Sequence, residues 1–248
     1  MPPRRNPRAV SCPARPALPT RRRLRPETRP RNPPVTAHRR SIIDACLAMN
    51  ASGLNQGTSG NVSLRTDDGF LITPSGIAYD AMSEDQIVPV AMDGSHEGPF
   101  LPSSEWRMHR DIYAGHADAG AVVHLHSPHA TALSCLRRDI PPFHYMIAVA
   151  GGTTLRCASY ATFGTQALSE AMLSALENRK ACLLANHGMI CFERTLDKAL
   201  WLAGEVETLC RQYILACQAG TPVILSNSEM ADVLDRFATY GRQPARES

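Results

Sequence analysis

The sequence predicts an α/β fold in which a central, mostly antiparallel or mixed sheet is layered between helices. Helical and strand patterns alternate along the chain, but the strands are short and are not regularly separated by helices. The Gly57-x-x-Gly60 segment has neither the full glycine fingerprint of a dinucleotide-binding fold nor the Lys-Ser/Thr of a P-loop. With 248 residues, 44% of them hydrophobic, the chain is long enough for one domain with a sizeable core.

Hydrophobic periodicity and turn residues place the elements in order. Ile42, Ile43 and Met49 lie on one helical face, and Gly53 suits the end of that helix. Asp67-Asp68-Gly69 indicates a hairpin between the next two strands. The expected helices cover residues 42–49, a stretch capped by Ser103 or Ser104, and residues 128–136, 166–176, 195–218 and 228–237. The expected strands cover residues 61–65, 70–73, 87–92, 121–126, 155–159, 181–185 and 189–192.

Composition divides the chain into three ranges. Residues 1–36 are rich in Arg and Pro with almost no apolar periodicity, so we expect a disordered tail, or a mis-assigned start of the gene. A basic arm for nucleic acid or an acidic membrane, or an organelle transit peptide, is the alternative. Residues 37–241 form the expected folded domain, and residues 242–248 a flexible C-terminal tail.

Charge is unevenly distributed over these ranges. The formal net charge is +3, but residues 1–40 hold twelve Arg and one acid, a net of +11, which leaves −8 for the rest. We therefore expect no nucleic-acid binding by the folded domain. No apolar run approaches the length of a membrane span, and the eight cysteines include no Cys-x-x-Cys pair. These features predict a cytoplasmic protein with reduced cysteines and no membrane contact.

Four side chains suggest a metal site. His124 and His126 are two residues apart on an apolar strand, so both imidazoles would point to the same face. His187 follows another short apolar strand, and Glu105 is the carboxylate that we nominate to join them. Three neutral histidines with a carboxylate or a water form a tetrahedral zinc site. A lone His-x-His is more often a polar detail of a half-buried strand, but two imidazoles in an apolar strand need partners.

Seven segments in chain order resemble the class II aldolase and ribulose-phosphate 4-epimerase family. They are GLNQGTSGNVS (53–63), LITPSG (71–76), SSEW (103–106), HLH (124–126), HYMI (144–147), YATFGT (160–165) and HG (187–188). Each segment is weak evidence alone, but their joint order extends over some two hundred residues, from about Ala37 to Tyr240. The resemblance implies the layered fold, a Zn²⁺ cofactor on Glu105 and the three histidines, and a small phosphorylated ketose as substrate.

The resemblance also implies a reaction, the reversible cleavage of L-fuculose 1-phosphate to dihydroxyacetone phosphate and L-lactaldehyde through a metal-stabilised enediolate. A Schiff-base lysine is not needed, and the chain has only Lys180 and Lys198, both outside the segments that match. Another sugar-phosphate aldolase or ribulose-5-phosphate 4-epimerase of the same family is the alternative. A member without metal or activity is a third reading, against which the joint presence of the four ligands argues. Manganese or cobalt would also suit the ligand set.

Further site residues are carried over from the resemblance. Glu105 is the expected acid/base, although a carboxylate there could simply favour a helix N-terminus. Tyr145 is the expected second proton carrier, reaching the site from a neighbouring subunit of a homotetramer, although such a tyrosine is more often a core or interface aromatic. Phe163 and Tyr240 would line the aldehyde side. Small polar residues, which alone would be ordinary turns or caps, would bind the phosphate: Thr58, Asn61, Ser75, Gly76, Ser103 and Ser104.

Overall fold

The structure is a computed structural model that describes residues 35–237, all of them within one unit of residues 33–248. Its helices are α1 (Val35–Ala51), α2 (Trp106–Gly115), α3 (Pro128–Ser134), α4 (Gln166–Ala175), α5 (Leu196–Ala219) and α6 (Asn227–Phe237), with short 3-10 helices η1 (Glu84–Gln86) and η2 (Tyr145–Ala150). Its strands are β1 (Asn61–Arg65), β2 (Gly69–Ile72), β3 (Val88–Ala91), β4 (Ala121–Leu125), β5 (Cys157–Ala158), β6 (Ala181–Leu184) and β7 (Gly188–Glu193).

The strands form one sheet in the order β3-β2-β1-β4-β7-β6-β5. Every neighbouring pair is antiparallel except β5 and β6, which are parallel. The sheet is therefore mixed and mostly antiparallel, as the sequence predicts. The central strand β4 pairs with β1, and this pairing places Asn61 directly opposite His124. This register brings two of the predicted site residues side by side in the middle of the sheet.

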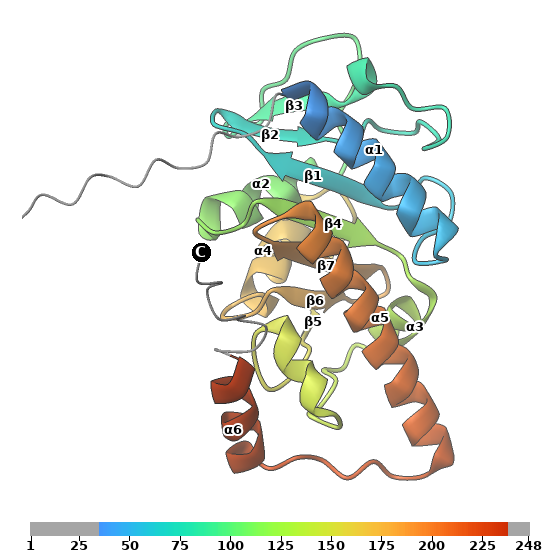
Figure 1. Cartoon of the computed structure of the whole chain (residues 1–248), viewed down its shortest axis with the longest axis vertical. Helices are drawn as coiled ribbons and strands as arrows, with labels where there is room; N and C mark the ends of the chain where they lie inside the picture. Colours follow the sequence, from blue (N-terminus) through green and yellow to red (C-terminus); the bar gives the residue numbers. More distant parts are fainter. Residues whose placement is uncertain (1–34, 238–248) are drawn as a thin grey trace, which may run out of the picture. The chain divides into compact units, whose positions relative to one another are not determined.

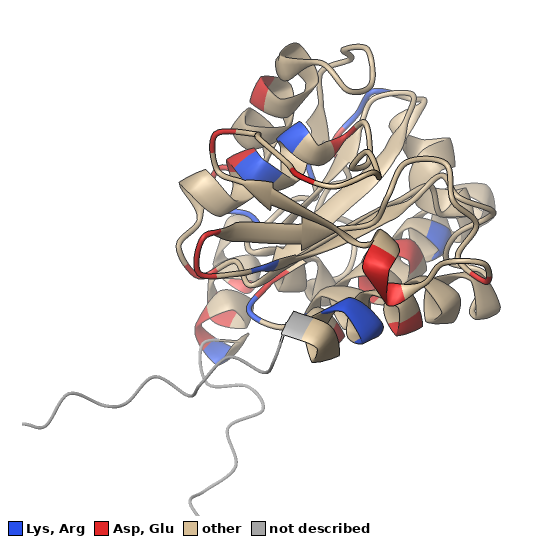
Figure 2. Cartoon of the chain, turned by 90° about the horizontal axis from the view of Figure 1, so that it is seen from above, with Lys and Arg blue, Asp and Glu red and all other residues tan. Residues whose placement is uncertain are grey.

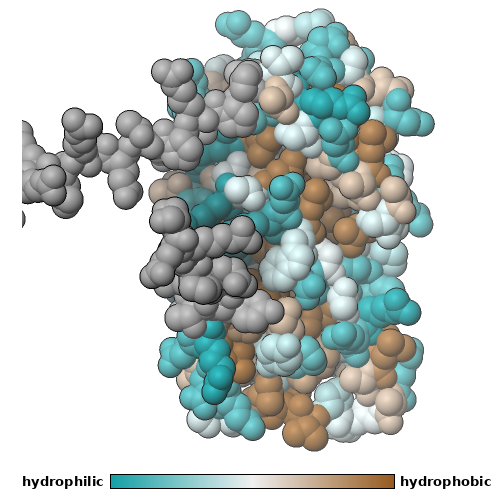
Figure 3. Space-filling model, viewed as in Figure 1, coloured by the Kyte–Doolittle hydropathy of each residue, from teal (hydrophilic) through white to brown (hydrophobic). Residues whose placement is uncertain are grey.

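Helices cover both faces of the sheet (Figure 1). On one face, α1, α3 and α5 pack against side chains such as Val62, Val123 and Leu183. On the other, α2 and α4 pack against Phe70, Val122 and other strand residues. The charged residues lie mainly on the helices and loops, and the strands carry few of them (Figure 2). The face drawn in Figure 3 mixes hydrophilic side chains with small hydrophobic groups. The predicted arrangement of a sheet between helices is confirmed.

Most predicted elements are present, with shifts at their ends. Helix α1 begins at Val35, so residues 35–36, which we assigned to the tail, are helical. Strand β4 ends at Leu125, so His126 lies just beyond the strand that was expected to include it. Helix α2 begins at Trp106, so Glu105 occupies the N-cap position and not the first turn. The helix η2, which contains Tyr145, was not predicted.

Some predictions lie outside the described residues. The ranges 1–34 and 238–248 hold most of the N-terminal tail, the C-terminal tail and Tyr240. Within residues 35–237, none of the helices combines the length and apolar character needed to cross a membrane. The cysteines of this range, from Cys46 to Cys217, are all free thiols.

Candidate functional site

Three short chain segments bring the four predicted metal ligands together. His124 lies in β4 and His126 directly follows that strand. Strand β4 pairs with β7, so the end of β4 lies beside the turn that joins β6 to β7, and this turn carries His187. Asn186 adopts a positive φ of 53° in the same turn, a conformation that Asn tolerates better than most residues. Glu105 enters from the N-cap of α2.

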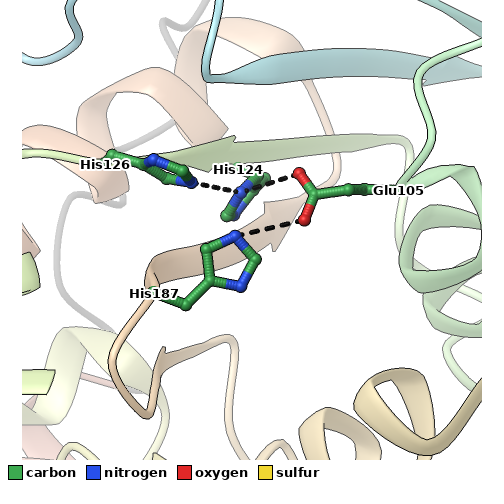
Figure 4. A group of neighbouring side chains, drawn as sticks. All are labelled: Glu105, His124, His126 and His187. Atoms are coloured by element: carbon green, nitrogen blue, oxygen red, sulfur yellow. Dashed lines mark hydrogen bonds and ion pairs between the residues drawn. The ribbon is translucent and has the colours of Figure 1, made fainter. Parts of the chain in front are cut away.

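The ligand atoms converge on one point (Figure 4). Glu105 Oε2 lies 3.1 Å from His124 Nε2, and Glu105 Oε1 lies 3.1 Å from His187 Nε2. His124 Nε2 and His126 Nε2 are also 3.1 Å apart. One candidate ligand atom from each of the four residues lies within 4.8 Å of all the others. The structure therefore brings together all four predicted ligands.

Hydrogen bonding shows that these atoms suit a cation. His124 Nδ1 lies 2.8 Å from the carbonyl oxygen of Met189, which only accepts, so Nδ1 carries the proton and Nε2 offers a lone pair. That lone pair faces His126 Nε2 and a carboxylate oxygen. Glu105 Oε1 is buried and accepts no hydrogen bond from the described residues, despite its nearness to His187. An orphaned carboxylate oxygen among imidazole nitrogens fits a divalent metal ion.

Electrostatics favour the ionised carboxylate. Burial opposes ionisation of Glu105, but the neighbouring His124 and His187 outweigh it and hold the carboxyl pKa well below its ordinary value. Burial also opposes charge on His124, but the Glu105 carboxylate raises the pKa of that imidazole. Burial, with repulsion from His124 and His187, lowers the pKa of His126 to about 4. An ionised carboxylate and a neutral imidazole are the forms that bind metals.

A pocket of about 340 Å³ opens over these ligands. Its lining includes Glu105, His126 and His187, together with all six residues predicted to bind phosphate: Thr58, Asn61, Ser75, Gly76, Ser103 and Ser104. An isolated antiparallel bridge between Pro74 and Pro102 explains why two of the polar clusters meet, because it joins the two segments at the residues directly before Ser75 and Ser103. The backbone N–H of Ser103 donates to the carbonyl of Thr73 at 3.0 Å and strengthens this contact.

The predicted aldehyde-side residues differ in position. Phe163 lines the pocket and is largely exposed. Tyr145 does not line it: the side chain is 51% exposed at the start of η2, with its ring against His144 and Phe237. Within this chain, Tyr145 is thus separate from the pocket that holds Glu105.

Three polar residues near the site were not singled out from the sequence. Tyr160 lines the pocket, and its YATFGT segment was noted only as a matching segment. His109 and Ser63 lie behind the ligands and are fully buried. Their spacing is a signal that could have identified them: His109 is one helical turn after Glu105, and Ser63 is two strand residues after Asn61.

A partly buried set of three imidazoles and a carboxylate at the base of an open polar pocket, on a mixed sheet between helices, defines a metal-dependent enzyme for a small polar substrate. Residues 40–214 match the family model described as "Class II Aldolase and Adducin N-terminal domain". The chain belongs to this family. Within it, the relatives and the metal-ligand group identify the chain as a class II aldolase, a lyase.

Named relatives are similar over most of the chain. The L-fuculose phosphate aldolase of Escherichia coli (strain K12) is 55% identical over 203 residues, which are 82% of this chain and 94% of the relative. The 5-methylthioribulose-1-phosphate/5-deoxyribulose-1-phosphate aldolase of Rhodospirillum rubrum is 52% identical, over 83% of this chain and 93% of the relative. A solved structure of an L-fuculose 1-phosphate aldolase superposes with a TM-score of 0.79 at 39% identity, covering 82% of this chain and 96% of that one.

Proposed function

We propose that the protein reversibly cleaves L-fuculose 1-phosphate to dihydroxyacetone phosphate and L-lactaldehyde, with Zn²⁺ held by Glu105, His124, His126 and His187. The observation that carries this proposal is one pocket in which three of the four proposed metal ligands meet six small residues suited to a phosphate. The relative that is 55% identical, an L-fuculose phosphate aldolase, supports the choice of sugar.

The phosphate would bind through neutral donors. Among the lining residues there is no Lys or Arg, so hydroxyl groups and backbone N–H groups must supply the hydrogen bonds. Gly76 has a positive φ of 72° and open space where a Cβ would lie, which leaves its backbone accessible. Thr58, Ser75 and Ser104 add hydroxyl groups from separate loops. The metal-binding end of the same pocket then faces the carbon skeleton of the ketose.

Cleavage requires two proton movements at defined atoms. A bound divalent ion supplies positive charge that stabilises the negative charge developing on the dihydroxyacetone phosphate half. The carbon that loses its bond must then receive a proton, and Glu105 Oε1 is the carboxylate oxygen that accepts no hydrogen bond within residues 35–237. The same carboxylate would remove that proton in the direction of synthesis. The hydroxyl that becomes the aldehyde must lose its own proton to a second group.

Tyr145 is that second group in our proposal, acting in the site of a neighbouring subunit. Its exposed ring cannot serve the pocket of its own chain, which supports a homotetramer with sites between subunits. Mixed oligomers test this. His126→Ala lacks a metal ligand and Tyr145→Phe lacks the phenol, and hybrids of the two would contain some sites with both groups intact. Recovered activity in hybrids supports shared sites, and hybrids no more active than the separate variants would contradict them. We place the enzyme in the cytoplasm, in keeping with its free thiols.

A second candidate function follows from the other relative. The enzyme of Rhodospirillum rubrum, 52% identical, is named for 5-methylthioribulose-1-phosphate and 5-deoxyribulose-1-phosphate. Product analysis with L-fuculose 1-phosphate, both of these ketose phosphates and ribulose 5-phosphate would distinguish the alternatives. We expect the highest kcat/KM with L-fuculose 1-phosphate. A higher value with another ketose phosphate, or epimerisation without release of a triose phosphate, would overturn the substrate assignment.

A further inference from the structure

A buried histidine that binds no metal lies behind the site. His109, on α2, has no solvent-exposed surface, and its two ring nitrogens contact Asn61 and Ser63 of β1. His109 Nε2 is 2.5 Å from Asn61 Oδ1, and His109 Nδ1 is 2.7 Å from Ser63 Oγ. Ser63 Oγ is in turn 2.7 Å from the hydroxyl of Tyr113. Nothing in the proposed reaction uses this imidazole directly.

The spacing of residues along strand β1 and helix α2 explains why these side chains meet. Asn61 and Ser63 are two residues apart on a strand and point to the same face of the sheet. Glu105, His109 and Tyr113 follow one another at intervals of four along α2 and its N-cap, which places them on one side of the helix. Asn61 therefore lies between Glu105 and His109, and Ser63 lies between His109 and Tyr113. The resulting chain of hydrogen bonds runs from Tyr113 to the carboxylate of Glu105.

The donor and the acceptor of each hydrogen bond in this series can be assigned. A carboxylate only accepts, so the atom of Asn61 that lies 2.9 Å from Glu105 Oε2 is the amide nitrogen Nδ2. Asn61 Oδ1 then faces His109 and needs a donor, so His109 carries its proton on Nε2. His109 Nδ1 is left with a lone pair and accepts from the Ser63 hydroxyl. Ser63 has no second proton, so Tyr113 donates to it. All the donors point toward Glu105.

These hydrogen bonds reach only one of the two carboxylate oxygens of Glu105. Oε2 accepts from Asn61, while Oε1 accepts no hydrogen bond from the described residues. If the Asn61 amide turned over, its oxygen would face a carboxylate and its nitrogen would face the proton of His109. The Nε2 proton of His109 therefore adds to the repulsion from Glu105 and opposes this rotation from the other side of the amide. Burial, together with repulsion from His124, lowers the pKa of His109 to about 3, so the imidazole stays neutral near pH 7.

We propose that His109 is a positioning residue that locks the Asn61 amide, which anchors Glu105 through Oε2 and leaves Oε1 free for the metal and the proton. This inference rests on the metal site of the proposed function, but not on the identity of the sugar. Partners that orient metal ligands from behind typically contribute 10-fold to 100-fold to metal affinity or activity, as a rough range.

The test is zinc affinity of the full-length protein, measured by competition with a chromophoric chelator. His109→Phe keeps the ring and removes both nitrogens, and we expect roughly 10-fold to 100-fold weaker zinc binding. His109→Gln retains an N–H that can reach Asn61, and we expect it to recover most of the affinity. His116→Phe is the matched control: the same substitution at the C-cap of the same helix, at a partly buried ring that packs against Phe192 and takes no part in the hydrogen bonds that lead to Glu105. We expect wild-type affinity there.

A second measurement covers the case in which His109→Phe does not fold. Nitrogen-15 NMR of the zinc-loaded wild-type protein should show His109 as the neutral tautomer protonated at Nε2. The other tautomer would overturn the proposal, as would equal zinc affinity in His109→Phe and His116→Phe. Weaker zinc binding in His109→Phe, with no triose phosphate released by the wild-type enzyme, would support the positioning role and reject the proposed substrate. The two ideas can therefore fail separately.

Discussion

Glu105 Oε1 lies 3.1 Å from His187 Nε2, although one residue starts a helix on one face of the sheet and the other sits in a strand turn. The contact exists only when α2, β4 and the β6–β7 turn are all in place. Metal affinity should therefore respond to changes in the backbone around the ligands as well as to changes in the ligands.

Gly188 is the first such backbone position. A Cβ placed there would lie 2.6 Å from the carbonyl oxygen of Leu125 and 2.8 Å from Cδ2 of His126. Gly188→Ala must therefore shift the backbone at Leu125 or the ring of His126, one of the proposed ligands, and we expect zinc affinity to fall on the order of 10-fold to 100-fold.

Gly204→Ala is the control for that experiment, because a Cβ at Gly204 in α5 would meet open space. It should keep its zinc and stabilise the protein by up to about 1 kcal/mol. Unchanged zinc binding in Gly188→Ala would show that the ligand geometry does not depend on this close approach.

Glu207 of α5 caps a different helix. Its carboxylate accepts from the backbone N–H groups of His129 and Ala130, both at 2.9 Å, at the start of α3. It also contacts His129 Nδ1 at 2.6 Å, whereas Ser127, the N-cap residue, makes no side-chain capping bond. Glu207→Ala should lower the free energy of unfolding by about 1–2 kcal/mol, measured by chemical denaturation. Glu205→Ala, on the same helix, should change it by less than about 0.5 kcal/mol, and equal losses in both would reject the capping role.

Stability should depend on pH through His109. Its pKa is about 3 in the folded protein, below the ordinary value of 6.5. Between about pH 6.5 and pH 3, His109 is protonated in the unfolded chain but not in the folded protein. The free energy of unfolding therefore decreases as the pH falls through this range, and the contribution of His109 is fully present only above about pH 6.5.

The contribution of this one group approaches about 1.4 kcal/mol per pH unit between pH 6 and pH 4. His109→Gln should remove that contribution, so its unfolding free energy should decline less steeply than that of the wild type. Denaturation of metal-free samples at several pH values would measure both slopes. Parallel slopes would mean that the buried imidazole does not control this part of the pH dependence.

The sequence predicted the parts of the fold that depend on local patterns. The strand over residues 61–65 was predicted to the residue, and the helices α4 and α5 nearly so, because their apolar spacing and caps lie within the segment itself. The His-x-His spacing likewise predicted that the imidazoles of His124 and His126 lie close together, and their Nε2 atoms are 3.1 Å apart. The end of β4 was missed, since the strand stops where pairing with β7 stops, and pairing depends on a distant segment.

The hydrogen bonds behind the metal-ligand residues could not be predicted from the sequence. Spacing alone places His109 on the same side of α2 as Glu105, but it cannot show that Asn61 lies between them. That contact depends on which strand lies under the helix and on the register of β1 with β4. The position of Tyr145 was equally inaccessible, because the 3-10 helix that presents it has no distinctive sequence period.

The most direct test of the account is the release of dihydroxyacetone phosphate from L-fuculose 1-phosphate by one purified sample in three states. Release would be measured on the protein as isolated, after treatment with a chelator, and after zinc is restored to one ion per chain. We predict that release is lost on chelation and recovered with zinc, and that His187→Ala does not recover. Release that survives complete removal of the metal, or no release from fully zinc-loaded protein, would contradict the account.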